Sequence, residues 1–178
     1  MSRYRRSLAG GATFFFTVNT YRRRNILTHP DVRLALRNGI EHVRERMPFT
    51  IDAWVLLPNH LHAIWTLTAG DADYALRWRL IKTHFSRGLA AGEHRSESRT
   101  AKGERGIWQR RYWEHTLRDD RDFGQHADYI HINPVKHGHV QRVMDWPYSS
   151  FHGFVRLGIY PSAWAGGDLD DHGAFGER

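Results

Sequence analysis

The strongest restriction on the fold comes from two apolar runs that are separated by a two-residue turn. Residues 51–57 (IDAWVLL) and 60–68 (HLHAIWTLT) are rich in β-branched and aromatic side chains, and Pro58-Asn59 between them is a turn signal. This spacing predicts a hairpin, because two strands joined by so short a turn can pair only in opposite directions. The chain is therefore expected to contain an antiparallel sheet.

Strand and helix patterns alternate on both sides of this hairpin. Residues 13–20 (TFFFTVNT) are typical of a buried strand, whereas apolar residues recur at helical spacing from Pro30 to just before Pro48. The remaining expected elements are a helix from Asp73 to about Leu89, a strand over 107–117, a helix from the Asp119-Asp120 cap to about Ile132, and a short helix around 147–154. We expect the long helix to end there because Asn133 precedes Pro134.

The resulting order of strand, helix, strand, strand, helix and strand is that of a ferredoxin-like (RRM-like) α+β fold. Such a fold is an antiparallel sheet covered by helices, and this chain adds extra C-terminal helices. Residues 1–178 are expected to form a single domain, since no repeat or second domain is apparent. Residues 90–106 lack apolar periodicity and are expected to form a mobile loop, and residues 165–178 a frayed tail.

The composition points to a nucleic-acid partner. The chain has 26 Lys plus Arg against 19 Asp plus Glu, a formal net charge of +7, together with 7 Trp, 7 Tyr and 9 Phe. Nearly all of the basic residues are Arg, which pairs with phosphates and stacks on bases, while aromatic rings stack on unpaired bases. A solvated arginine-rich surface without a nucleic-acid partner is the alternative explanation of the same composition.

Two absences narrow the class further. The chain has no Cys, so disulfide frameworks, thiolate zinc sites and cysteine nucleophiles are excluded, and any metal ion must be bound by His, carboxylate or amide oxygen. No apolar run reaches the roughly 18 residues of a membrane span, and the start of the chain lacks the apolar stretch of a secretory signal. We therefore expect a cytoplasmic protein with no membrane partner.

The second strand of the expected hairpin carries the first candidate site. His60 and His62 are two residues apart, so in a strand both imidazoles project from one face, about 6.6 Å apart along the backbone. Two such rings can bind one metal ion. A pair of hydrogen-bonded strand histidines without a metal is also compatible with this spacing, because the chain contains 13 His.

The long helix carries the second candidate site. Tyr129 and Asn133 are four residues apart and therefore lie on one helical face. A helical Tyr is most often a packing residue. Its phenol, with a pKa of about 10, becomes an effective nucleophile only when a cation polarises the phosphate that it attacks, so the two candidate sites would need to meet in space.

Several ordered blocks of the sequence resemble one protein family. LPNHLH (57–62) and YIHINPVKHG (129–138) are similar to the two signature blocks of the REP-associated tyrosine transposases, which belong to the HUH single-tyrosine transposase superfamily. The segments LRWRLIKT (76–83), IWQRRYWEH (107–115) and DWPYSSF (145–151) are similar to that family too. The resemblance covers about residues 13–155 and implies that the single domain is an HUH transposase-like domain.

The resemblance implies a metal-dependent single-stranded DNA endonuclease and strand transferase. His60 and His62 resemble the histidine pair that binds a divalent ion, Mg²⁺ or Mn²⁺, and Tyr129 resembles the nucleophile that forms a 5′-phosphotyrosine intermediate. Asn133 stands where relatives carry a Gln as the third metal ligand. Because Asn is shorter, His126 or a water molecule is the alternative third ligand.

The substrate that the resemblance implies is a repetitive extragenic palindrome (REP), a DNA hairpin flanked by a short single-stranded segment. The basic residues that we expect to contact this DNA are Arg3, Arg5, Arg6, Arg22, Arg23, Arg24, Arg110 and Arg111. Two other functions stay open at this point: a single-stranded nucleic-acid-binding module without catalysis, and a hydrolase in which the histidine-bound metal activates water. The oligomeric state, monomer or homodimer, is open as well, and a DNA substrate implies association with the nucleoid.

Overall fold

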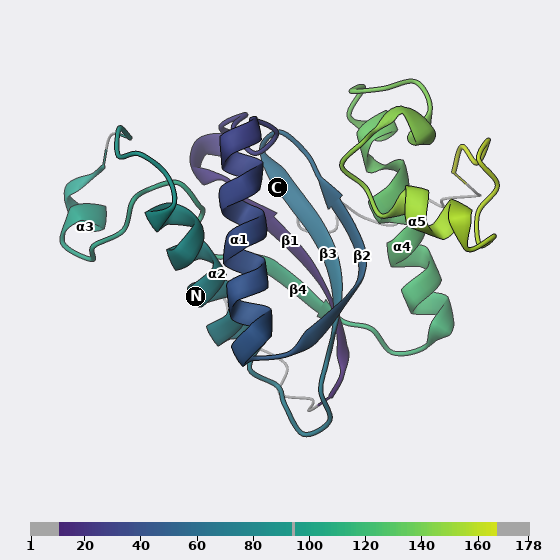
Figure 1. Cartoon of the computed structure of the whole chain (residues 1–178), viewed down its shortest axis with the longest axis horizontal. Helices are drawn as coiled ribbons and strands as arrows, with labels where there is room; N and C mark the ends of the chain where they lie inside the picture. Colours follow the sequence, from purple (N-terminus) through teal and green to yellow (C-terminus); the bar gives the residue numbers. More distant parts are fainter. Residues whose placement is uncertain (1–10, 94, 167–178) are drawn as a thin grey trace, which may run out of the picture.

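The computed structural model describes residues 11–93 and 95–166, which contain one four-stranded antiparallel sheet (Figure 1). The strands are β1 (Thr13–Asn19), β2 (Phe49–Leu56), β3 (His60–Leu67) and β4 (Trp113–Thr116), in the spatial order β2-β3-β1-β4. β2 and β3 form the expected hairpin, with Leu56 opposite Leu61 across the turn. The predicted α+β class and the ferredoxin-like strand order are confirmed.

Helices cover both faces of the sheet. α1 (Pro30–Arg46) and α2 (Tyr74–Arg87) pack on each other over one face, and α4 (Asp120–Lys136) lies over the other, against β2 and β3 (Figure 1). The short elements are η1 (Tyr21–Arg23), α3 (Glu97–Thr100), η2 (Val143–Asp145) and α5 (Phe151–Arg156), of which η2 and α5 pack beside α4 as the expected C-terminal additions. No helix within the described part of the chain is long and apolar enough to cross a membrane.

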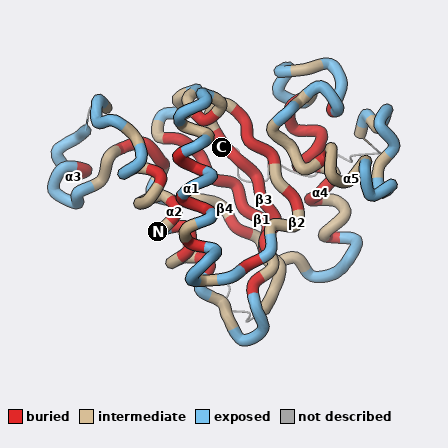
Figure 2. The backbone as a smooth tube through the Cα atoms, in the orientation of Figure 1, coloured by how far each residue is buried: buried red, intermediate tan, exposed pale blue. Residues whose placement is uncertain are grey.

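Side-chain alternation along β1 divides the core into two layers. Phe14, Phe16 and Val18 belong to the larger cluster beneath α1 and α2, whereas Phe15 belongs to the cluster beneath α4. Every residue of β1 after Thr13 is buried, and β3, which with β1 forms the red central strands in Figure 2, is buried at every residue except Thr66. Because both faces of β1 are covered, Phe14, Phe15 and Phe16 follow one another without an intervening polar residue.

The two segments around β4 differ from the prediction. The strand expected over 107–117 is reduced to β4, because Ile107 and Trp108 pair instead with the chain just after β1: Thr20 bridges Trp108, and Tyr21 N–H donates to Ile107 O at 2.8 Å. The loop expected over 90–106 contains the four-residue helix α3. Arg105 also donates to the Leu89 and Ala90 carbonyl oxygens, so part of this segment is attached to the end of α2.

The C-terminal end of α4 also differs from the prediction. The helix was expected to end at about Ile132, but it continues through Pro134 to Lys136. A proline this close to the helix end removes one backbone donor and leaves few later hydrogen bonds to disturb. His139 N–H donates to Pro134 O, and Gly138 ends the helix in the left-handed region at φ 69°. The short helix expected around 147–154 begins only at Phe151, as α5.

The close crossing of α1 and α2 leads to a prediction about stability. A Cβ atom at Gly39 in α1 would lie 3.2 Å from both Ile81 O and Phe85 N of α2. Because these are backbone atoms of a packed helix, Gly39→Val should force the helices apart and lower the free energy of unfolding by about 1–3 kcal/mol. Urea denaturation followed by circular dichroism measures this change.

Gly124 in α4 provides the matched control. A Cβ atom there would meet no atom within 4 Å, so Gly124→Ala should raise the free energy of unfolding by about 0.5–1 kcal/mol through helix propensity alone. Equal stability changes of the same sign in both variants would contradict the close crossing at Gly39.

Candidate active site

His60 and His62 begin β3 and project from the face of the sheet that α4 covers. Their backbone partners on β1 are Asn19 and Thr17. Both imidazoles are buried, and their ring centroids are 4.9 Å apart at an interplanar angle of 83°. The alternation of β3 thus brings the two rings close enough to bind a single ion.

Each imidazole is oriented by a hydrogen bond at Nδ1. His62 Nδ1 lies 2.9 Å from Thr17 Oγ1, and His60 Nδ1 lies 2.6 Å from Asn59 Oδ1. When Nδ1 carries the proton, each ring donates this bond and offers Nε2 as a ligand, which is the usual arrangement of a metal-binding histidine. Two buried imidazoles held in this way fit a divalent cation.

α4 places Tyr129 directly against the histidine pair. The Tyr129 ring is 5.3 Å from the His62 ring and meets it edge to face, and the Phe15 ring packs against both. Asn133, one turn further along α4, is fully buried. The residues expected to act as nucleophile and as ligands therefore come from two elements that meet on one face of the sheet.

A second group of titratable side chains lies where α4 begins. His115 of β4, Asp122 and His126 each offer a ligand atom, and these atoms lie within 4.8 Å of one another. Asp122 Oδ2 accepts hydrogen bonds from His115 Nε2 at 3.0 Å and from the backbone N–H and Nε of Arg118. The residue types and spacing suggest a metal site.

The charges of this second group follow from burial and hydrogen bonding. Burial opposes ionisation of Asp122, but hydrogen bonds from His115 and Arg118 outweigh it and lower the pKa of Asp122 to about 2. Burial also lowers the pKa of His126 below its usual value. Asp122 is therefore ionised and His126 neutral at pH 7, the forms in which both residue types bind metal ions.

Two of the arginines expected to contact DNA follow a residue that is bonded to the β2–β3 turn. Arg22 and Arg23 form η1 with Tyr21, directly after Thr20, whose N–H donates to Asn59 O at 2.9 Å. Both arginines have positive φ, 57° and 51°, in the left-handed region that costs an L-residue roughly 1–2 kcal/mol. Strain of this kind is concentrated at functional segments.

The other arginines expected to contact DNA are not part of η1. Arg24 donates to Gly106 O at 3.0 Å, and Arg110 donates to both carboxylate oxygens of Glu104 at 2.9 Å. Arg111 is exposed. Arg3, Arg5 and Arg6 lie outside the described residues.

Thr17, His115 and Asp122 were not singled out from the sequence, although a signal existed for two of them. Asp122 precedes His126 by four residues on the expected helix, and Thr17 shares the face of Phe15 on the expected first strand. What the sequence lacks is the register that pairs Thr17 with His62 and brings His115 to Asp122.

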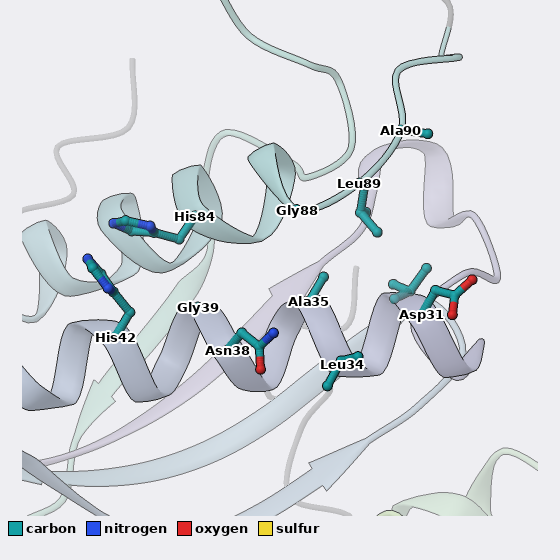
Figure 3. A pocket seen from close by; sticks show the side chains of 11 residues that line it. Asp31, Leu34, Ala35, Asn38, Gly39, His42, His84, Gly88, Leu89 and Ala90 are labelled. Atoms are coloured by element: carbon teal, nitrogen blue, oxygen red, sulfur yellow. The ribbon is translucent and has the colours of Figure 1, made fainter.

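The other face of the sheet has a groove between α1 and α2, with a volume of about 800 Å³ (Figure 3). Leu34, Ala35, His42, His84 and Leu89 are among the side chains that line it. None of the expected site residues lines this groove, which α1 and α2 place opposite α4. The candidate active site is therefore on the α4 face.

Comparisons with known proteins agree with one family, although no family model matches the chain. The chain is 48% identical over its full length to the REP-associated tyrosine transposase of Escherichia coli (strain K12), of which the alignment covers 98%. It is 44% identical to a Haemophilus influenzae protein assigned to the same family, over 93% of this chain and 94% of the relative. The solved structure of a REP-associated tyrosine transposase bound to a REP hairpin superposes with a TM-score of 0.83 and 47% identity, covering 100% of this chain and 98% of the other.

Fold and sequence similarity together show a tyrosine transposase, a class of enzyme that cleaves and joins DNA. More narrowly, the chain belongs to the REP-associated tyrosine transposases. The family expected from the sequence blocks is thus confirmed. The alternative function, a nucleic-acid-binding module without catalysis, is excluded by membership of this enzyme family.

The hydrogen bond between Thr17 and His62 gives a prediction about metal affinity. Thr17→Val keeps the shape of the side chain but removes the partner of His62 Nδ1, so the ring loses its fixed orientation. We expect Mn²⁺ affinity, measured by calorimetry on the purified chain, to fall about 10- to 100-fold.

Thr13→Val is the control for this change. Thr13 lies on the same strand and face and bonds to Thr66 rather than to a histidine. Unchanged Mn²⁺ affinity in Thr17→Val, or an equal loss in Thr13→Val, would show that the Thr17 hydroxyl does not orient a ligand.

Proposed function

We propose that this protein cleaves and rejoins single-stranded DNA beside REP-type hairpins, with Tyr129 as the nucleophile and His60 and His62 as metal ligands. The observation that carries the proposal is the edge-to-face contact of the Tyr129 and His62 rings at 5.3 Å. This contact brings a phenol to the only pair of neighbouring strand histidines that face α4 in the described residues. The solved relative with a TM-score of 0.83 is bound to a REP hairpin, which supports the substrate class.

The cleavage step needs an activated phenol and a held phosphate. The Tyr129 oxygen attacks a DNA phosphorus, the Oη–P bond forms and the P–O3′ bond breaks, leaving a 5′-phosphotyrosine and a free 3′-hydroxyl. The phenol proton passes to water, and the departing O3′ takes a proton from water. Since the phosphotyrosine keeps the energy of the phosphodiester, a 3′-hydroxyl can reverse the step and rejoin strands without ATP.

Mg²⁺ or Mn²⁺ is the cation that fits this chemistry. When bound, it polarises a non-bridging phosphate oxygen and offsets the negative charge of the transition state. The chain's own contribution is the buried imidazole pair held by Thr17 and Asn59, with the amide of Asn133 as third ligand and His126 as the alternative. Mixed imidazole and amide-oxygen ligation suits Mg²⁺ or Mn²⁺.

The strained turn of Arg22 and Arg23 supports a DNA path that reaches the site from the end of β1. Arg22 is exposed and Arg23 half-buried, and they follow Thr20, whose N–H donates to the carbonyl oxygen of Asn59, the residue before His60. Phosphate contacts of this kind fix the position of the strand without reading its bases. Arg24, Arg110, Arg111 and the N-terminal Arg3, Arg5 and Arg6 are the further contacts that we propose.

A single chain supplies every residue of the proposed site. Tyr129 and the histidine pair meet within one molecule, so catalysis requires no exchange of helices between subunits. We therefore propose that a monomer is active. A DNA substrate of this class supports a location in the cytoplasm, at the nucleoid.

The nucleophile gives the central prediction. Tyr129→Phe removes the attacking oxygen and should abolish both cleavage and the covalent protein–DNA product. The measurement is incubation of a single-stranded REP-type hairpin with Mn²⁺, followed by denaturing electrophoresis for protein linked to the 5′ end of the product. EDTA should abolish the same product in the wild-type chain.

Tyr148→Phe, a tyrosine in the segment that pairs with β2, is the control and should retain adduct formation. A Tyr129→Phe chain that still cleaves DNA without an adduct would favour the alternative hydrolase, in which a metal-activated water attacks. DNA binding should change less than about threefold in Tyr129→Phe, since the phenol is buried and one hydroxyl carries little of the phosphate affinity.

The basic turn gives a separate prediction about salt. Hairpin affinity should fall about tenfold or more between 50 and 200 mM NaCl, because several Arg groups displace counterions. Arg22→Gln with Arg23→Gln should weaken binding and flatten this dependence, measured by fluorescence anisotropy. Arg37→Gln on α1, where Arg37 pairs with Glu41, is the control; an equal effect there would argue against a DNA path along η1.

A further inference from the structure

The described residues place a cation on the phenol oxygen of Tyr129. Lys136 Nζ lies 3.5 Å from Tyr129 Oη and 4.7 Å from the centroid of the same ring. Tyr129 is 4% exposed, whereas Lys136 is an exposed residue at the last position of α4. The buried phenol therefore has beside its oxygen an ammonium group that belongs to an exposed residue.

The geometry of α4 explains this placement. Residues seven positions apart lie on one helical face two turns from each other, and Lys136 follows Tyr129 by seven. The spacing holds only because α4 continues through Pro134; a helix that ended at Ile132 would not present Lys136 to the phenol. His137, the next residue, lies 5.1 Å from His60 ring to ring, so this end of α4 closes over the histidine pair.

We infer that Lys136 is a catalytic residue of the DNA-cleavage step, an inference that rests on the proposed role of Tyr129. As the Oη–P bond forms and the P–O3′ bond breaks, negative charge moves between the phenol oxygen and the phosphate oxygens. An ammonium beside Oη stabilises this charge and donates a hydrogen bond to the oxygen. In the rejoining step it stabilises the same oxygen as the phosphotyrosine bond breaks and phenolate leaves, which then takes a proton from water.

A packing role is the alternative explanation of the same contact. The alkyl chain of a lysine can cover an aromatic ring without any part in chemistry, and its charge can bind DNA in general. Loss of the packing role would lower the stability of the chain, and loss of the DNA-binding role would lower its affinity for DNA. A role at the reacting oxygen acts on the rate at which the bound complex reacts.

The experiment measures three quantities in Lys136→Gln, Lys136→Arg and the control Lys102→Gln. They are the thermal midpoint, the affinity for a REP-type hairpin by anisotropy, and the single-turnover rate of 5′ adduct formation with saturating protein. Lys102 is an exposed lysine outside the α4 face, so its variant removes one charge at a distance from Tyr129.

We expect Lys136→Gln to lower the single-turnover rate about 100-fold, the size of effect seen when one donor to a developing oxyanion is removed. Affinity should change less than about threefold, and the rejoining rate should fall with the cleavage rate. Lys136→Arg should restore part of the rate, since it returns the charge with a different shape. Lys102→Gln should react as the wild type does.

A Lys136→Gln chain that reacts at the wild-type rate would overturn the inference while leaving Tyr129 as the nucleophile. A rate loss that is matched by an equal loss of affinity or by a large drop in thermal midpoint, with no rescue by Arg, would also overturn it. A wild-type chain that forms no adduct would overturn the proposed function, and the role of Lys136 with it.

Discussion

The contact of Phe15 with both His62 and α4 is the interaction on which the site depends. This fully buried ring packs against His62 at 5.5 Å, Tyr129 at 6.2 Å and His126 at 4.8 Å, measured between ring centroids. Burial of a phenylalanine stabilises a fold by roughly 1.5–3 kcal/mol, and replacing one in a core by Ala costs about 3–5 kcal/mol. Together with the other apolar residues of its cluster, among them Ile64 of β3 and Ile130 of α4, Phe15 holds α4 over the strand that carries the histidines.

The two ends of α4 are held by different chemistry. At its start, Asp119 caps the helix and Asp122 joins His115 of β4 to Arg118 through charge-assisted hydrogen bonds. At its end, the helix passes Pro134 and stops at the left-handed Gly138. The contacts at both ends help to fix the rotation of α4 about its axis. This rotation decides whether Tyr129 faces the histidine pair.

The segment of residues 148–150, which follows η2, restrains the sheet further. Leu56 N–H donates to Tyr148 O at 2.9 Å and Ser150 N–H donates to Trp54 O at 2.8 Å, so the chain after η2 pairs with the outer edge of β2. This covers an edge that would otherwise expose unpaired backbone groups. The C-terminal additions therefore complete the sheet as well as packing beside α4.

Much of the fold followed from local patterns. The Pro58-Asn59 turn, the apolar runs and the Asp119 cap located the hairpin, β1 and the start of α4 because each depends on neighbours in sequence. The predicted end of α4 and the predicted length of β4 were wrong, because a proline near a helix end is tolerated and because the start of the expected last strand bonds to another segment. Ile107 bonds to Tyr21 instead of extending β4. In the segment before it, Arg105 donates to Leu89 O and so attaches part of residues 90–106 to the end of α2.

The amino-acid sequence alone was sufficient to place His60 and His62 on one side of a strand and Tyr129 and Asn133 on one side of a helix, because these relations follow from backbone periods of 2 and 3.6. Tertiary packing was required to bring the two sides together. The register of β1 against β3 selects Thr17 as the partner of His62, and the packing of α4 on Phe15 brings Tyr129 to the His62 ring. Neither choice is encoded in local spacing, since both join residues whose distance is set by how separate elements pack.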